Sequence, residues 1–366
     1  MLSFELSEEQ KMIRDTVGAF AREQIRPAAR PADESGEIPA ALVAQAWQLG
    51  LVQGPIPESL GGNGDTRLAM TGALIAEELA YGDLAIAAHV LAPRLLVFPV
   101  LEMGTDEQRA RHLKRFTGAD FAPAGAALME PRWDFDPTAM TTLARNDGNG
   151  FVLDGAKCMV ALAAASETLL IWAASAGSDR VDGFLVARET PGLSVGEREK
   201  NMGLKALESY PIELKGCRVG AEARLGGEGG ADFRRAMSQS RLAMAAMGVG
   251  LAHAAFDYAR DYAKERKAFG VPIATKQAVA FMLADMAIEI DAARLLVWEA
   301  AWRLDRGEDA HRESYLARNY VAASALKVAD NAVQVLGGHG YIREHPVEMW
   351  LRNARGLSAI EGLATV

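Results

Sequence analysis

The spacing of hydrophobic residues predicts helices over the first part of the chain, residues 1 to about 120. Apolar residues recur three and four positions apart near its start, at Met12, Ile13, Val17, Phe20 and Ala21. Ser7, with Gln10 three positions later, forms a capping box, which predicts that this helix begins there. The same periodicity predicts further helices over 39–49, 71–81, 83–100 and 106–116. We therefore expect an N-terminal helical domain over residues 1–120.

The pattern changes between residues 121 and about 230. Short apolar runs lie between turn residues at 150–155, 169–173 and 183–187, and such runs are typical of strands. The glycine-rich segment 226–230 indicates a plain linker. A central β domain over residues 121–230 is therefore predicted.

Helical periodicity returns from residue 231 to the end. One apolar stripe is formed by Ala278, Phe281, Met282, Met286, Ile290, Ala293 and Val297. A second long helix, rich in alanine, is predicted over 312–336. Long helices that pack side by side form bundles, so residues 231–366 are expected to be a helical bundle whose remaining apolar surface forms a subunit interface. The fold class is mainly α with a β insert.

Composition and charge exclude several classes of function. The 366 residues carry a net charge of −9 without a basic run, which argues against nucleic acid as a partner. No uninterrupted apolar run is long enough for a membrane span, and the acidic N-terminus lacks the features of a targeting peptide. Cys158 and Cys217 form neither a disulfide framework nor a metal-ligand spacing, so no metal is predicted and a cytoplasmic location is expected.

The segment 264–277 (KERKAFGVPIATKQ) predicts the end of one helix, a turn, and the start of another. By itself it is typical of a solvated helix end. Followed along the chain together with Arg241, residues 334–338 (QVLGG) and Glu361-Gly362, it resembles the acyl-CoA dehydrogenase family, flavoenzymes that desaturate acyl-CoA thioesters. The resemblance covers nearly the whole chain. It implies an N-terminal helical domain, a small central β-barrel or sandwich, a C-terminal four-helix bundle, and FAD as the cofactor.

The resemblance places the catalytic base at Glu361, with Arg241 near the acyl-CoA. Desaturation requires a base for the α proton, a flavin for the β hydride, and dipoles that hold the thioester carbonyl. The neighbours of Glu361 are apolar, and a carboxylate in an apolar pocket has its pKa raised by desolvation. The alternative is a carboxylate near a frayed chain end. Its distance from residues 337–341 and 346–352 matches the family and favours the base.

The resemblance also assigns binding residues and partners. The residues implied to hold FAD are Arg266, Phe269, Gln277, Gln334, Gly337, Gly338, Met129, Val160 and Ala161. The residues implied to contact the acyl-CoA are Phe135, Asn201, Ser238, Arg241 and Gly362. The expected partners are an electron-transferring flavoprotein or similar acceptor, and other subunits in a homo-oligomer (a dimer of dimers) or in a hetero-oligomer with a sister chain. His339 is expected to be a plain turn residue.

Two stretches depart from the family. Residues 129–136 (MEPRWDFD) stand where the family has Thr-Glu-Pro-x-Ala-Gly-Ser-Asp, so the first hydroxyl is lost at Met129 and a bulky Phe135 replaces a small residue. A second hydroxyl, expected beside flavin N5, is missing at Ala161. The adenine side of the FAD site is retained, and in the family the two sides come from different subunits. Two alternatives therefore stay open: a half-site or non-catalytic subunit of a heteromer, and altered chemistry such as that of an oxidase or a desulfinase-like enzyme.

Overall fold

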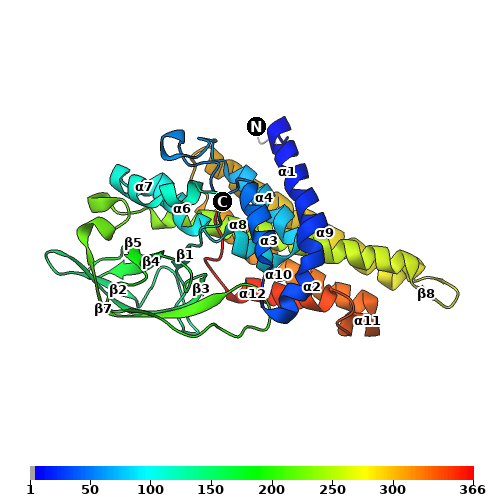
Figure 1. The fold of residues 1–366 in the computed structure, drawn as a ribbon. Helices are drawn as coiled ribbons and strands as arrows, with labels where there is room; N and C mark the ends of the chain where they lie inside the picture. Colours follow the sequence, from blue (N-terminus) through cyan, green and yellow to red (C-terminus); the bar gives the residue numbers. More distant parts are fainter. Residues whose placement is uncertain (1–4) are drawn as a thin grey trace.

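The computed structural model describes residues 5–366 and shows two helical parts with a β part between them (Figure 1). The α-helices of the first part are α1 (Glu8–Phe20), α2 (Arg26–Ser35), α3 (Ala40–Gln48), α4 (Ala69–Gly82), α5 (Leu84–Leu91), α6 (Arg94–Met103) and α7 (Asp106–His112). Short helical turns join them at η1 (Ala21–Ile25), η2 (Glu58–Leu60) and η3 (Lys114–Thr117). The sequence predicted this mainly α fold with its β insert correctly.

Local sequence signals explain where two of these helices begin and end. The capping box of α1 is present, because the Ser7 amide donates to Gln10 Oε1 at 3.0 Å and the Gln10 amide donates to Ser7 Oγ at 3.1 Å. The prediction of one helix over 83–100 was wrong. Pro93 has no amide hydrogen to donate to the preceding turn, so the helical hydrogen bonds are interrupted there although Ala92 keeps helical dihedral angles, and the chain divides into α5 and α6, which meet at 42°.

The β part is a seven-stranded sheet within the described chain, with order β1-β4-β2-β3-β7-β6 and β5 added on β4. Its strands are β1 (Gly125–Ala127), β2 (Leu143–Asn146), β3 (Gly150–Ala161), β4 (Thr168–Ser175), β5 (Val181–Ala187), β6 (Leu193–Val195) and β7 (Ser209–Gly220). Strand β3 runs six residues past the predicted 150–155 because it pairs along most of β7, with two register shifts that bend it. The sheet lies at one end of the molecule, away from the far ends of the long helices (Figure 1).

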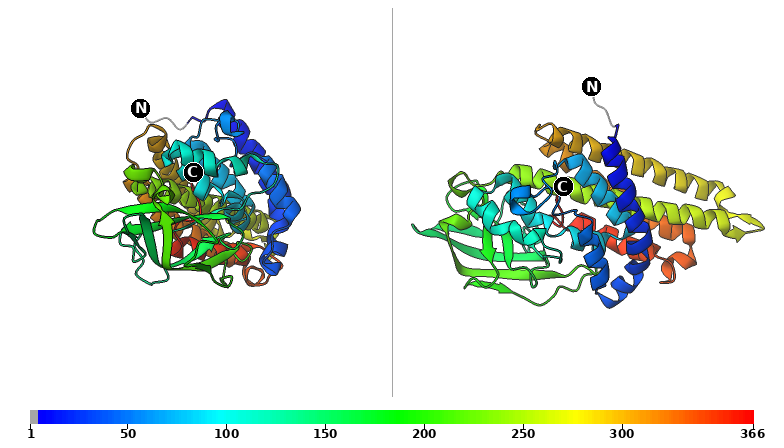
Figure 2. Two further views of the ribbon diagram at one scale, coloured as in Figure 1. Left: turned by 60° about the vertical axis from the view of Figure 1, so that its left-hand side comes forward. Right: turned by 45° about the horizontal axis from the view of Figure 1, so that its top comes forward.

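Between the sheet and the bundle lie two further helical turns, η4 (Ala221–Ala223) and η5 (Gly227–Gly229). The bundle contains α8 (Phe233–Glu265), α9 (Gln277–Asp305), α10 (His311–Leu336), α11 (Gly338–Tyr341) and α12 (Val347–Ala359). A two-stranded hairpin, β8 (Lys267–Ala268) and β9 (Val271–Pro272), and the turn η6 (Ile273–Thr275) connect α8 to α9. The hairpin lies at the tip of the molecule opposite the sheet (Figure 2).

Helix α8 forms the centre of this bundle. Among the described helices it is the one long and apolar enough to cross a membrane, but 78% of its most apolar window is buried inside the protein. Its apolar side chains are therefore core residues of the bundle.

The apolar stripe predicted on α9 was only partly right. Met286, Ile290, Ala293 and Val297 are buried, whereas Phe281 is 61% exposed. At its start α9 lies beside the end of α8 (Figure 2), and Met282 and Leu283 pack against the core there, whereas the Phe281 side chain is left exposed.

A buried ion pair fixes the loop that follows β1 onto the sheet. Lys157 on β3 is fully buried, and its Nζ lies 2.9 Å from Leu128 O and 3.3 Å from Glu130 Oε1. Glu130 also accepts hydrogen bonds from the amides of Thr141 and Thr142. Burial would raise the pKa of Glu130, but these hydrogen bonds and the Lys157 charge outweigh it and lower the pKa to about 2. The pair therefore holds residues 128–130 in a defined position.

Because the pKa of Glu130 is lower in the folded than in the unfolded chain, its contribution to stability is complete above about pH 4.3 and is lost as the pH falls towards 2. The full contribution is about 3 kcal/mol. The difference in unfolding free energy between the wild type and Glu130→Gln, measured by urea unfolding, should therefore shrink between pH 5 and pH 3. Trp133→Ala, which changes an exposed residue of the same loop without removing an ionisable group, is the control and should show no such change. A difference that is constant with pH would contradict this role.

Candidate functional site

The structure gathers predicted site residues into two regions that lie far apart in one chain. The first, here called the base region, contains Glu361, Gly362, Arg241 and Met129. The second, here called the dinucleotide pocket, is a cavity of about 360 Å³ lined by Tyr262, Arg266, Ile273, Val335, Leu336, Gly337, Gly338 and His339. The base region adjoins the sheet, and the pocket lies near α11 and β8 at the opposite end of the bundle (Figure 1).

The backbone of Glu361 is held on both sides. The buried side chain of Arg318, on α10, donates to Ile360 O at 2.7 Å and also to Leu357 O, which caps the end of α12. Residues 363–366 are buried as well. Gly362 has a φ of 77°, and a Cβ there would lie 2.7 Å from Leu128 Cδ2, so both the backbone and the packing require glycine. The carboxylate therefore lies in an ordered core segment, and the frayed-end alternative is wrong.

The Glu361 side chain is placed to accept a proton. It is 25% exposed, and its Oε1 lies 3.9 Å from Arg241 Nε. Within the described residues, its buried Oε2 has no hydrogen-bond partner, and neither has Arg241 Nε. The Glu361 amide donates to Met129 Sδ at 3.2 Å. A fixed carboxylate with an unpaired buried oxygen can serve as a general base once a substrate proton lies within reach.

A small apolar cavity of about 30 Å³ adjoins the base region. It is lined by Leu95, Pro99, Leu128, Trp172, Met237 and Gly362, among others. Ser240 also lines it, and its buried hydroxyl has no partner among the described residues. Ser238, which the sequence assigned to the substrate, donates instead to Arg234 O of its own helix at 2.8 Å.

The side expected to face the flavin ring offers few polar side chains. Val160 and Ala161 are fully buried on β3. Asn201 donates to Ser209 Oγ at 3.1 Å, and Ser209 is the cross-strand partner of Ala161. Phe135 packs against the apolar core next to the loop. Met129 contributes its thioether to the Glu361 amide rather than a hydroxyl.

The dinucleotide pocket has the features that a pyrophosphate needs. Arg266 follows α8 directly, and its exposed guanidinium has no hydrogen bond or ion pair to the described residues. Gly337 has a φ of 59°, which favours glycine. Gly338 is different, because its backbone is ordinary and a Cβ there would meet no atom within 4 Å. A free guanidinium beside open glycine backbone fits a phosphate group.

The three other residues assigned to this side lie around the pocket without lining it. Phe269 is 96% exposed at the tip of the hairpin, with Lys276 Nζ 5.8 Å from its ring centroid. Gln277 begins α9 and Gln334 lies in the last turn of α10, and both are exposed. Their side chains are therefore free to contact a neighbouring chain or a ligand.

The sequence missed three residues of these regions. Tyr262 precedes Arg266 by four positions, and this helical spacing could have indicated that both face the pocket. His339, expected to be a turn residue, lies in the single helical turn α11, lines the pocket and is hydrogen-bonded to Tyr262. Arg318 reaches backbone 39 and 42 residues away, and no local pattern could have indicated that contact.

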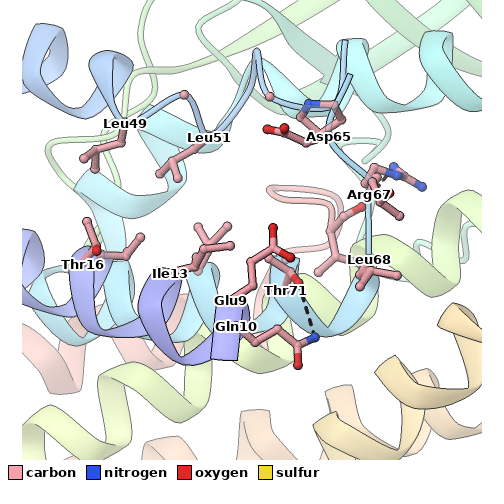
Figure 3. A pocket seen from close by; sticks show the side chains of 18 of the residues that line it. Glu9, Gln10, Ile13, Thr16, Leu49, Leu51, Asp65, Arg67, Leu68 and Thr71 are labelled. Atoms are coloured by element: carbon pink, nitrogen blue, oxygen red, sulfur yellow. Dashed lines mark hydrogen bonds between the residues drawn. The ribbon is translucent and has the colours of Figure 1, made fainter. Parts of the chain in front are cut away.

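A larger cavity of about 410 Å³ lies between α1, the loop after α3 and the start of α4 (Figure 3). Its walls include Ile13, Leu51 and Leu68, with Arg67 at one side (Figure 3). Gln10 Nε2 lies 3.5 Å from Thr71 Oγ1 across its floor. None of the residues predicted for cofactor or substrate lines this cavity.

Comparisons with known proteins agree with the resemblance. Models of the N-terminal, middle and C-terminal domains of acyl-CoA dehydrogenases match residues 7–120, 125–217 and 227–366. A short-chain specific mitochondrial acyl-CoA dehydrogenase of Bos taurus is 34% identical, over 100% of this chain and 89% of its own. An acyl-CoA dehydrogenase of Bacillus subtilis is 33% identical, over 98% of this chain and 95% of its own.

Solved structures give the same result. Butyryl-CoA dehydrogenase of Megasphaera elsdenii superposes with a TM-score of 0.88 at 27% identity, covering 100% of this chain and 96% of that one. An FAD complex of PigA superposes with a TM-score of 0.88 at 25% identity, covering 97% of this chain and 94% of that one. The chain belongs to the acyl-CoA dehydrogenase family of FAD-containing oxidoreductases that act on CH–CH groups.

Proposed function

We propose that this protein is an FAD-dependent acyl-CoA dehydrogenase that introduces an α,β double bond into an acyl-CoA thioester, with Glu361 as the catalytic base. The observation that carries this proposal is the Glu361 carboxylate, whose backbone is fixed by Arg318 and Met129 and whose Oε2 is buried and unpaired. Arg241, close to the carboxylate, helps to orient the bound thioester. FAD, when bound, supplies the hydride acceptor.

The separation of the two regions supports an assembled site. Arg241 and Arg266 are 25 positions apart along α8 (266 minus 241), which is about 38 Å at 1.5 Å per residue. One FAD cannot bridge that distance within a single chain. The dinucleotide pocket of one chain therefore serves the base region of a neighbour, either a second copy or a sister chain. An electron-transferring flavoprotein or a similar protein reoxidises the enzyme.

The small cavity beside the base limits the acyl group. A volume of about 30 Å³ is enough for one or two water molecules, and Trp172 and Met237 close it with bulky side chains. The proposed substrate is therefore a short-chain acyl-CoA. The bovine relative is named for the same class, which supports this choice.

A second candidate rests on the ring side of the site. Met129 and Ala161 provide no hydroxyl, and the Met129 thioether is engaged by Glu361. In this alternative the chain is one subunit of a heteromer and gives its intact dinucleotide pocket to a sister chain. Stoichiometric FAD in the purified homo-oligomer would exclude it, whereas FAD acquired only with a sister chain would favour it.

The first prediction concerns the base. Glu361→Gln keeps the shape and the backbone contacts but cannot accept a proton, so FAD content should be unchanged. The rate at which butyryl-CoA reduces the flavin should fall by at least about 10²–10⁴-fold. This rate is measured as the loss of flavin absorbance near 450 nm. Glu344→Gln, an exposed carboxylate beyond α11, is the control and should react at the wild-type rate. Wild-type reduction by Glu361→Gln would remove it as the base.

The second prediction concerns the dinucleotide pocket. Gly338→Ala meets no atom of its own chain and lies in a helical turn, so folding should be unaffected. FAD affinity should nevertheless fall, because the added methyl group occupies the space in which we place the ligand.

Arg266→Ala should weaken the free energy of FAD binding by about 1.5–3 kcal/mol, the scale of a hydrogen bond to a charged group. Gly229→Ala, equally open but in η5, is the matched control. The FAD affinities of Gly338→Ala and Arg266→Ala can be measured by titrating each apo-protein with FAD. Unchanged affinities in both variants would place the dinucleotide elsewhere.

The third prediction concerns substrate length. Met237→Ala should enlarge the cavity beside Gly362 and raise kcat/KM for hexanoyl-CoA relative to butyryl-CoA by about tenfold or more. Met244→Ala, equally buried on α8 but outside the lining, should cost similar stability without this shift. An unchanged ratio in Met237→Ala would show that this cavity does not hold the acyl group.

A further inference from the structure

A cluster of tyrosine and histidine side chains lies beside the dinucleotide pocket and has no part in the function proposed above. The Tyr262 hydroxyl lies 2.7 Å from His339 Nδ1, and the Tyr258 hydroxyl lies 2.7 Å from His345 Nδ1. The two imidazole rings are 5.6 Å apart between centroids. Of the two histidines, only His339 lines the pocket. The cluster therefore contains two similar pairs, one facing the ligand space and one behind it.

The backbone fixes where His339 points. Chain direction changes at Gly337, and the amide of Gly340 donates back to Gly337 O at 2.9 Å. A Cβ at Gly340 would lie 2.3 Å from Val333 O, so only glycine lets α11 fold this closely onto the end of α10. His339 is thereby held between Tyr262 and the pocket.

The hydrogen bond to Tyr262 determines what His339 offers to a ligand. The contact allows two neutral tautomers: either Nδ1–H donates to the tyrosine oxygen and Nε2 is an acceptor, or the hydroxyl donates to Nδ1 and Nε2 carries the proton. An anion beside Nε2 selects the second tautomer, because only in that tautomer does Nε2 donate. No carboxylate belongs to the pocket lining, so a bound anion would be the natural acceptor.

We infer that His339 is a specificity residue of the dinucleotide pocket, whose Nε2–H donates to a phosphate oxygen of the dinucleotide held by Arg266 and the Gly337-Gly338 backbone. Tyr262 is the positioning residue that keeps the donor on Nε2. This inference rests on the proposed location of the dinucleotide. It adds an imidazole donor to the guanidinium donors of Arg266, so the pocket selects phosphate groups over uncharged ligands.

The test measures ligand affinity of the apo-oligomer by isothermal titration with FAD and with ADP, which carries the adenine and two phosphates alone. His339→Phe keeps an aromatic ring without the donor, and affinity for both ligands should fall about 10- to 100-fold. His339→Asn can still form a hydrogen bond with Tyr262 but lacks a donor at the Nε2 position, so its affinity for both ligands should fall by a similar factor. His339→Gln, which can extend an amide N–H to the Nε2 position, should retain most of the affinity. Inorganic pyrophosphate should compete with ADP in the wild type and at least about tenfold less well in His339→Phe.

His345→Phe is the matched control, because it alters the same cluster outside the pocket and should leave both affinities unchanged. Tyr262→Phe removes the hydroxyl that keeps the proton of His339 on Nε2. It should lower the affinity for both ligands by a smaller factor than His339→Phe does. Unchanged affinity in Tyr262→Phe would overturn the positioning role of that residue.

The outcomes separate this inference from the proposed function. If Arg266→Ala and Gly338→Ala weaken FAD binding while His339→Phe and His339→Asn do not, the assignment of His339 falls and the proposed pocket stands. If none of the four weakens it, the location of the dinucleotide is wrong and both fall. Loss in His339→Phe with retention in His339→Gln supports the inference and excludes a purely structural role for the ring.

Discussion

The close packing of α8 against α4 and α10 is the constraint on which the rest of this structure depends. A Cβ at Gly250 would lie 2.0 Å from Glu77 O on α4, and a Cβ at Gly248 would lie 2.5 Å from Val321 on α10. The three helices approach this closely only because these positions are glycine. Helix α8 carries Arg241 towards one end and Tyr262 at the other, so the same contacts set the positions of the base region and of the dinucleotide pocket. About 38 Å of helix therefore separates the two regions within one chain.

Much of the fold could be predicted from the sequence because its signals are local. The capping box at Ser7, the alternating runs of the sheet and the long periodic helices each depend on residues a few positions apart. The errors occurred where tertiary packing decides. Phe281 has the spacing of a core residue, but its side chain is exposed on α9. At the carboxyl end the apolar neighbours of Glu361 favoured a buried setting over a frayed end, and Arg318 with the buried residues after Glu361 provides it.

The candidate site shows the same division. Arg266, Gly337 and Gly338 meet in one pocket as the resemblance implied, because each ends or follows a long helix whose course is set by the bundle. The hydrogen bond between Tyr262 and His339 could not be predicted because it joins residues 77 positions apart. A histidine after two glycines is typical of a turn, and only the close approach allowed by Gly340 turns it towards the cavity. Sequence patterns identify residues that are used for their chemistry more readily than residues that are used for their position.

The loop after β1 has a backbone path that is fixed by buried contacts. The Glu130–Lys157 pair still fastens the loop to β3, and the Cys158 amide still donates to Met129 O at 2.9 Å, so the backbone path there is well defined. What differs is where the side chain of residue 129 ends. A hydroxyl at this position could serve a cofactor, whereas the Met129 thioether accepts the amide hydrogen of Glu361 and joins the β part to the base. Residue 129 therefore links the loop after β1 to the backbone of Glu361 through its side chain, so a change of residue 129 alters that link as well as the surface of the loop.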